Sequence, residues 1–153
     1  MVMEVRTFSL GAGKDTVVFE STPSANGQDI ITGFTAGAGG DKLDVSAFLS
    51  SAASVDSQTG TGLTSGQVDT TSSKNVIVLS GSASTATKIK FTGANNTEYV
   101  VINDTDKKVY FYTAEDTTPV ALTSVLATDN QVATLTGVDA TTLVADNFIG
   151  IAP

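Results

Sequence analysis

The sequence contains no cysteine and no histidine. The first absence excludes disulfide bonds, thiolate metal sites and cysteine nucleophiles. The second removes the commonest general base and the usual zinc ligand. A catalyst without either residue would have to use carboxylates or a Lys–Ser pair. The composition therefore favours a protein that is not an enzyme.

Basic residues are also scarce, because eight Lys and Arg stand against sixteen Asp and Glu, for a net charge of −8. Phosphate binding needs a positive surface, so a nucleic-acid partner is not expected. An excess of negative charge repels itself and disfavours the compact state unless cations neutralise it. The acidity is consistent with cation binding or simply with solubility.

Long apolar runs are missing too. No stretch has the length needed to span a bilayer, so no membrane span is expected. The segment at residues 1–6 lacks the basic flank and the long apolar run of a secretory signal. Taken alone, that observation would predict a cytoplasmic protein.

What the sequence does have is Gly, Ser, Thr and Ala, with Val and Ile among its apolar residues. Of its 153 residues, 41% are hydrophobic and only 16% are charged. This mixture favours strands and turns, and predicts an all-β fold. The amino-acid composition divides the chain into three segments: a glycine-rich acidic segment at 1–49, a Ser/Thr/Gly-rich linker or loop at 50–73, and a strand-rich segment at 74–153.

Several strands are expected within this division. Residues 75–79 form a continuous apolar run, typical of a strand buried on both faces. Residues 88–91 alternate, so we expect an edge strand protected by lysines. Residues 98–103 and 109–113 predict a β-hairpin whose aromatic residues belong to the core. Further strands are expected at 15–19, 29–32, 131–135 and 147–151, and Ser46 could cap a short helix.

The segment GAGKDTV at residues 11–17 fits most of a glycine-rich calcium nonapeptide, G-G-x-G-x-D-x-U-x, in which U is a large apolar residue. Glycines permit left-handed turns that leave carbonyls open to a cation. An aspartate supplies the hard oxygen that Ca²⁺ prefers. A weaker copy, NGQDII at 26–31, keeps only the later positions, with Asn26 as a possible additional ligand.

Two further segments, DIITGF at 29–34 and DKLDVSAF at 41–48, together resemble the segment that closes the calcium β-roll of repeats-in-toxin (RTX) proteins. The resemblance covers roughly residues 8–50 and implies a short calcium β-roll-like N-terminal lobe, joined to a β-sandwich or β-roll C-terminal lobe. By this resemblance the calcium-linked residues would be Asp15, Asp29, Asp41 and Asp44, with Gly11, Gly13, Asn26 and Gly27. An alternative role for Asp44 is a helix N-cap.

The C-terminal segment VATLTGV at 132–138, with Leu143, Asp146, Phe148 and Ile149, resembles the end of S-layer-like proteins of the bacterial type I secretion class. That class carries an uncleaved export signal at the C-terminus, which implies an extracellular or cell-surface location and contact with the type I secretion machinery. A terminal strand that completes a sheet is the alternative for these residues.

Three functions remain open. The first is a calcium-stabilised structural subunit that self-assembles into an extracellular filament, S-layer or biofilm matrix. Its candidate assembly strand runs along residues 2–10, with Val2, Val5 and Phe8. The second is the C-terminal secretion and calcium-folding module of a larger exported protein. The third is a small carbohydrate-active or carbohydrate-binding protein that contacts cell-surface polysaccharide through acids around the hairpin.

Overall fold

A computed structural model describes residues 4–49, 54–60, 63, 65–71 and 73–150 of the chain. The expected all-β fold is confirmed, because its helical elements are single short turns. The strands are β1 (Thr7–Ser9), β2 (Thr16–Val18), β3 (Asp29–Thr32), β4 (Lys42–Asp44), β5 (Val55–Gln58), β6 (Gln67–Asp69), β7 (Val76–Leu79), β8 (Lys88–Lys90), β9 (Thr97–Asn103), β10 (Lys108–Ala114), β11 (Val120–Ala121), β12 (Gln131–Thr136) and β13 (Phe148–Ile149). The helices are α1 (Pro23–Asn26) and α2 (Leu122–Val125), and the 3₁₀ turns are η1 (Gly81–Thr85), η2 (Thr128–Asn130), η3 (Ala140–Thr142) and η4 (Ala145–Asn147).

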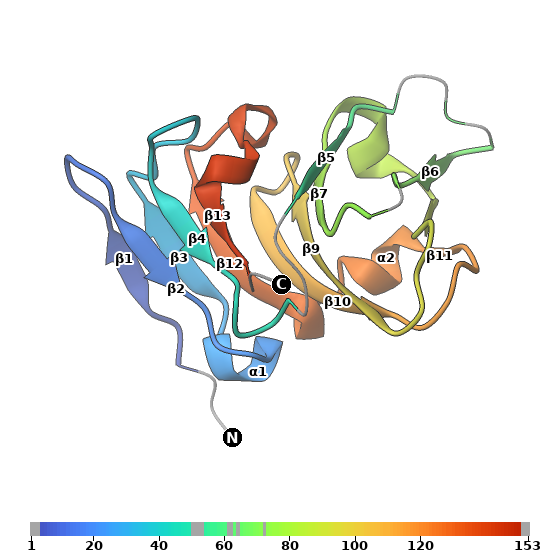
Figure 1. Ribbon diagram of the computed structural model, residues 1–153, viewed down its shortest axis with the longest axis horizontal. Helices are drawn as coiled ribbons and strands as arrows, with labels where there is room; N and C mark the ends of the chain where they lie inside the picture. The colour runs from blue at the N-terminus through green and yellow to red at the C-terminus, as the bar shows by residue number, and fades with distance from the viewer. Residues whose placement is uncertain (1–3, 50–53, 61–62, 64, 72, 151–153) are drawn as a thin grey trace.

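A central sheet of seven strands has the order β1-β3-β12-β10-β9-β7-β5 (Figure 1). The strand β10 is antiparallel to both of its neighbours, whereas all the other pairs in this sheet are parallel. Three strands therefore lie on each side of β10, and all six run in the same direction.

Two outer sheets of three strands each, β13-β4-β2 and β11-β8-β6, accompany the central sheet. The chain alternates between the central sheet and one outer sheet from β1 to β4, and between the central sheet and the other outer sheet from β5 to β9. This winding is roll-like. We call β1–β4 with β12 and β13 the first roll, and β5–β9 with β11 the second. A rung is one central strand with the outer strand that follows it.

The core consists of two apolar clusters on opposite faces of the central sheet. In β7, Val76 and Val78 belong to the first cluster, whereas Ile77 and Leu79 belong to the second. The first cluster includes the apolar residues of the outer sheet β13-β4-β2, and the second includes those of β11-β8-β6. All four side chains of β7 are buried, which confirms the prediction made from its unbroken apolar run.

The predicted hairpin is present as β9 and β10, which pair over seven residues. Its aromatic residues belong to the core, as expected. Tyr99, Tyr110 and Phe111 are buried, and Phe111 stacks on Phe48 with ring centroids 4.2 Å apart. Burial raises the pKa of the Tyr110 hydroxyl, which also donates a hydrogen bond to Asp106 at 2.7 Å.

Three expectations need correction. The segment at 50–73 is not a plain linker, because it contains β5 and β6, and strands from all three predicted segments meet in the central sheet. The strand at 88–90 is not an edge, because β8 lies between β11 and β6. Ser46 caps no helix, because residues 46–48 form a turn in which the carbonyl of Val45 accepts from Phe48 and Leu49.

Replacing Phe111 by Ala should destabilise the fold by about 3–5 kcal/mol, the usual cost of deleting a buried aromatic ring. The ring also meets Phe19 edge-on at 5.8 Å. Urea unfolding followed by circular dichroism measures the change. The exposed Val18→Ala is the control, and we expect it to change stability by less than about 0.5 kcal/mol. Equal effects of the two variants would contradict the proposed core.

Candidate functional site

Two of the predicted calcium ligands, Asp15 and Asp41, lie on neighbouring turns of the first roll. Each precedes by two residues the buried apolar residue of its outer strand, Val17 or Leu43, and these two residues are in register. Oδ1 of Asp41 accepts a hydrogen bond from the backbone N–H of Asp15 at 2.8 Å, and Oδ2 accepts one from Thr35 at 2.7 Å. Asp41 therefore ties one rung to the next.

Asp29 lies apart from this pair and has a cationic partner. Its carboxylate is bound by the guanidinium of Arg6, with an Nη2–Oδ2 distance of 2.8 Å and an Nε–Oδ1 distance of 3.2 Å. The same Oδ1 accepts the backbone N–H of Arg6 at 2.9 Å. The hydrogen bonds to Asp29 raise the pKa of Arg6. Because the Asp29 side chain is buried, this contact fixes β1 against β3.

The remaining predicted ligands serve local turns. Oδ1 of Asp44 accepts the backbone N–H of Ser46 at 3.0 Å. The side chain of Asn26 accepts the N–H of Glu20 and donates to the carbonyls of Glu20 and Thr22. The N–H of Gly11 donates to Oδ2 of Asp15 at 3.2 Å.

The predicted calcium ligands are not gathered at one place. Within the residues that the structure describes, no three acidic side chains come together. Arg6 already neutralises Asp29, and both carboxylate oxygens of Asp41 accept backbone N–H groups. The acidic side chains of the first roll instead accept hydrogen bonds from backbone N–H groups of turns or, in the case of Asp29, also bind Arg6.

The C-terminal residues predicted to form an export signal are part of the first roll. Leu143 and Phe148 are buried in the first cluster. Phe148 pairs with Leu43 and Ile149 with Asp44, so that β13 extends the outer sheet beyond β4. Oδ2 of Asp146 accepts the N–H of Gly39 at 2.7 Å, and Lys42 lies 3.3 Å from its Oδ1. These contacts lower the pKa of Asp146.

The expected assembly strand lies at the edge of the central sheet. Val2 lies outside the described residues, whereas Val5 is exposed and Phe8, in β1, is half-buried against the first cluster. The guanidinium of Arg6 covers the Phe8 ring at 5.5 Å.

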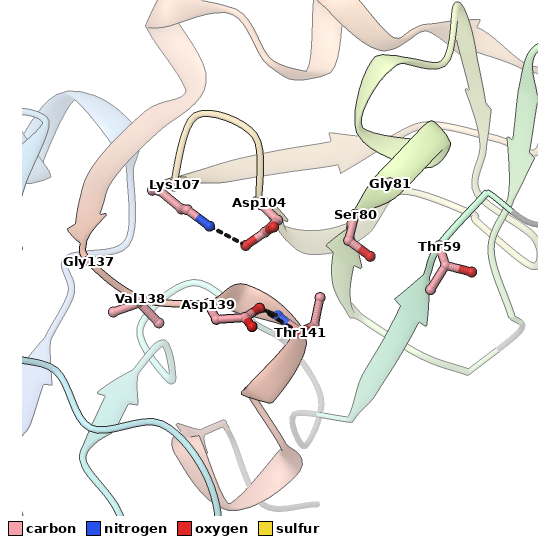
Figure 2. A pocket seen from close by; sticks show the side chains of 9 residues that line it. All are labelled: Thr59, Ser80, Gly81, Asp104, Lys107, Gly137, Val138, Asp139 and Thr141. Atoms are coloured by element: carbon pink, nitrogen blue, oxygen red, sulfur yellow. Dashed lines mark hydrogen bonds and ion pairs between the residues drawn. The ribbon is translucent and has the colours of Figure 1, made fainter.

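A pocket that the sequence did not reveal lies where β5, β7, β9 and β12 end (Figure 2). Parallel strands place their carboxyl ends at one edge of a sheet, which is where open sheets commonly hold ligands. The volume is about 660 Å³. Its walls are mostly polar or small residues: Thr59, Ser80, Gly81, Asp104, Lys107, Gly137, Val138, Asp139 and Thr141.

One ion pair and one further carboxylate give this pocket its charge. Nζ of Lys107 lies 2.6 Å from Oδ1 of Asp104, which also accepts the N–H of Ala140 at 2.8 Å. The hydroxyl and the N–H of Thr141 donate to Asp139, and together with nearby Lys107 they lower the pKa of Asp139. The pocket therefore combines carboxylate acceptors, an ammonium donor and hydroxyl groups.

The acids expected to cluster around the hairpin are divided between its two ends. Asp104 and Asp106 lie in the turn between β9 and β10, whereas Glu98, Glu115 and Asp116 lie near the opposite end. Seven residues of strand separate the two groups by about 20 Å. The two ends do not form a paired-carboxylate site with each other.

Some residues that make these contacts were not predicted from the sequence. Arg6 is the single arginine of the chain, which could have marked it as the partner of a buried acid. Asn147 is fully buried. The triplet Asp146-Asn147-Phe148 repeats the Asp-x-apolar pattern of residues 15–17 and 41–43. This repeat could have predicted that the three segments form equivalent strands. The pocket residues share no common motif, although Gly137 and Val138 belong to the C-terminal segment at 132–138.

Gly27 and Gly13 allow a matched test of the predicted glycine turns. Gly27 has φ 71°, and a Cβ there would lie 2.1 Å from the carbonyl oxygen of Glu4. Gly13 has φ 124° but open space around it. We expect Gly27→Ala to cost about 2–4 kcal/mol and Gly13→Ala about 1 kcal/mol in urea unfolding. Equal costs would contradict the close contact between residue 27 and Glu4.

Comparison with known proteins adds no family to this description. No protein-family model, curated protein or solved structure matches the chain. Across the residues that the structure describes, none of the helices has the length and apolar character needed to cross a membrane.

Proposed function

We propose that this protein is a secreted structural subunit that joins copies of itself into an extracellular filament, S-layer or biofilm matrix. The observation that carries the proposal is the open end of the first roll. The outer edges of β1 and β2 have no strand partner among the described residues. Roll and solenoid ends need a cap to stay soluble as single molecules.

The edge of β1 presents backbone groups in a regular pattern. The carbonyl of Arg6 accepts from Ile30, and the N–H of Leu10 donates to Thr32, so these residues face β3. Because successive residues of a strand alternate, the N–H and C=O groups of Thr7 and Ser9 face outward. An exposed row of this kind is a template for a strand of another chain.

Exposed apolar side chains flank the same end. Val5 precedes β1 and is 55% exposed, and Val18 lies in β2 and is 64% exposed. Both β1 and β2 lack lysine, which natural edge strands often carry to prevent pairing. A second copy is the partner that this edge fits best, because its own β1 and β2 offer the same unpaired groups.

Export by a type I secretion machinery, and the extracellular location that follows from it, are part of this proposal. They rest on the resemblance of the C-terminal segment.

Thr7→Pro should prevent assembly without unfolding the subunit. Proline removes the outward N–H of residue 7 while leaving the hydrogen bonds between β1 and β3 in place. We expect the wild type to form ordered particles in light scattering and electron microscopy as its concentration rises, and Thr7→Pro to stay monomeric.

Val18→Lys should act in the same direction by placing a charge on the edge of each copy. Val144→Lys is the matched control, because Val144 is also exposed but lies next to η4, and it should assemble like the wild type. A wild type that remains monomeric at all concentrations would reject the proposed function. Assembly of the Thr7→Pro variant would show that the outer edge of β1 is not the assembly surface.

A second candidate function, binding of a hydroxylated ligand such as a cell-surface polysaccharide, is favoured by the pocket in Figure 2. Asp139, Lys107 and the hydroxyl of Thr141 lie together there. Such groups hydrogen-bond to sugar hydroxyls. The second carboxylate of the pocket, Asp104, is paired with Lys107 and accepts the N–H of Ala140, so the proposal is limited to binding.

If a polysaccharide fragment binds in this pocket, Asp139→Asn should weaken binding about tenfold, the effect of losing about 1.4 kcal/mol of charged hydrogen bonding. Isothermal titration calorimetry with short surface oligosaccharides measures the affinity. Asp129→Asn, at an exposed acid in η2, is the control. Absence of heat with every oligosaccharide would remove this candidate.

A further inference from the structure

The first roll uses the same three-residue pattern in each rung of its outer sheet. Val17, Leu43 and Phe148 are in register across β2, β4 and β13. An aspartate precedes each of them by two residues: Asp15, Asp41 and Asp146. The third copy lies more than a hundred residues after the second along the chain.

Each aspartate of the pattern makes contact with a backbone N–H of a turn. Asp15 accepts from Gly11, Asp41 from Asp15 and Thr35, and Asp146 from Gly39. The contacts of Asp41 with Asp15, at 2.8 Å, and of Asp146 with Gly39, at 2.7 Å, reach across to neighbouring turns of the roll. In an RTX β-roll such turns would be joined by calcium. Here side chains make the connection directly.

Asn147 completes the connection between the C-terminal rung and the turn before β4. It is fully buried. Its Oδ1 accepts from Gly37 at 2.9 Å and Val144 at 3.0 Å, and its Nδ2 donates to the carbonyls of Gly37 at 3.1 Å and Asp41 at 2.9 Å. Three of these four hydrogen bonds hold the start of β13 against the turn before β4, and the fourth fixes the 3₁₀ turn of Asn147 itself.

We infer that the first roll folds without calcium, and that its own C-terminal rung, held against the turn before β4 by Asp146 and Asn147, takes the place of the ion. Residues 146–148 thus have a structural role in closing the roll. The roll is incomplete without residues 131–149, because β12 and β13 supply its third rung. The inference is independent of the proposed self-assembly and is tested on single molecules.

Thermal unfolding of the wild-type protein, in EDTA and in about 10 mM Ca²⁺, tests the inference. That concentration exceeds the dissociation constants of about 10⁻⁴–10⁻³ M of extracellular calcium sites. We expect the two values of Tm to agree within about 2 °C, with the full near-ultraviolet dichroism of a packed core in EDTA. A rise of about 5 °C or more with calcium, the size expected for a saturated site, would overturn the inference.

Asn147→Ala tests the role of the closing rung. We expect Tm to fall by about 6–12 °C, and by the same amount in EDTA and in calcium. Asn95→Ala, at an exposed loop position, is the control and should leave Tm unchanged. An Asn147→Ala variant as stable as the wild type, or one that calcium restores, would overturn the inference. If Asn147→Ala does not fold, the wild-type comparison still decides whether calcium is needed.

Discussion

The central sheet is apolar on both of its faces along β7 and β9, and the rest of the architecture follows from the need to cover both. Successive residues of a strand point to opposite sides, so Val76 and Ile77 belong to different clusters. A sheet of this kind is stable only when each face is shielded from water. The chain provides that shield by winding out to one outer sheet and then to another.

The same constraint explains why distant parts of the chain meet. The outer sheet of the first roll has two strands from the N-terminal third, β2 and β4, and one from the C-terminal end, β13. Phe148 joins the first cluster beside Leu43. The covering layer is therefore complete only with the last described strand, and Asn147 ties that strand to the turn before β4.

Acidic side chains have a structural role throughout the first roll. Glycine-rich turns leave backbone N–H groups without partners, and a carboxylate satisfies such a group strongly. Asp41 does so for two turns, and Asp29 compensates the charge of Arg6. The interior of the protein is closely packed, whereas the outer edges of β1 and β2 have no strand partner in the part of the chain that the structure describes. That combination supports the proposed self-assembly, while the pocket at the strand ends supports the proposed ligand binding.

The sequence by itself determined the local elements of this protein. The apolar run at β7 and the hairpin of β9 and β10 could be predicted, because strand periodicity and turn residues act over a few neighbours. The Asp-x-apolar turns could be located too, although their chemistry could not. Only the tertiary structure decided that Asp29 meets Arg6, that Asp41 accepts two backbone N–H groups, and that Asn147 closes the roll. Those contacts join residues 23, 26 and 106 positions apart, and pairing over such separations is set by the packing of whole sheets, which local composition does not encode.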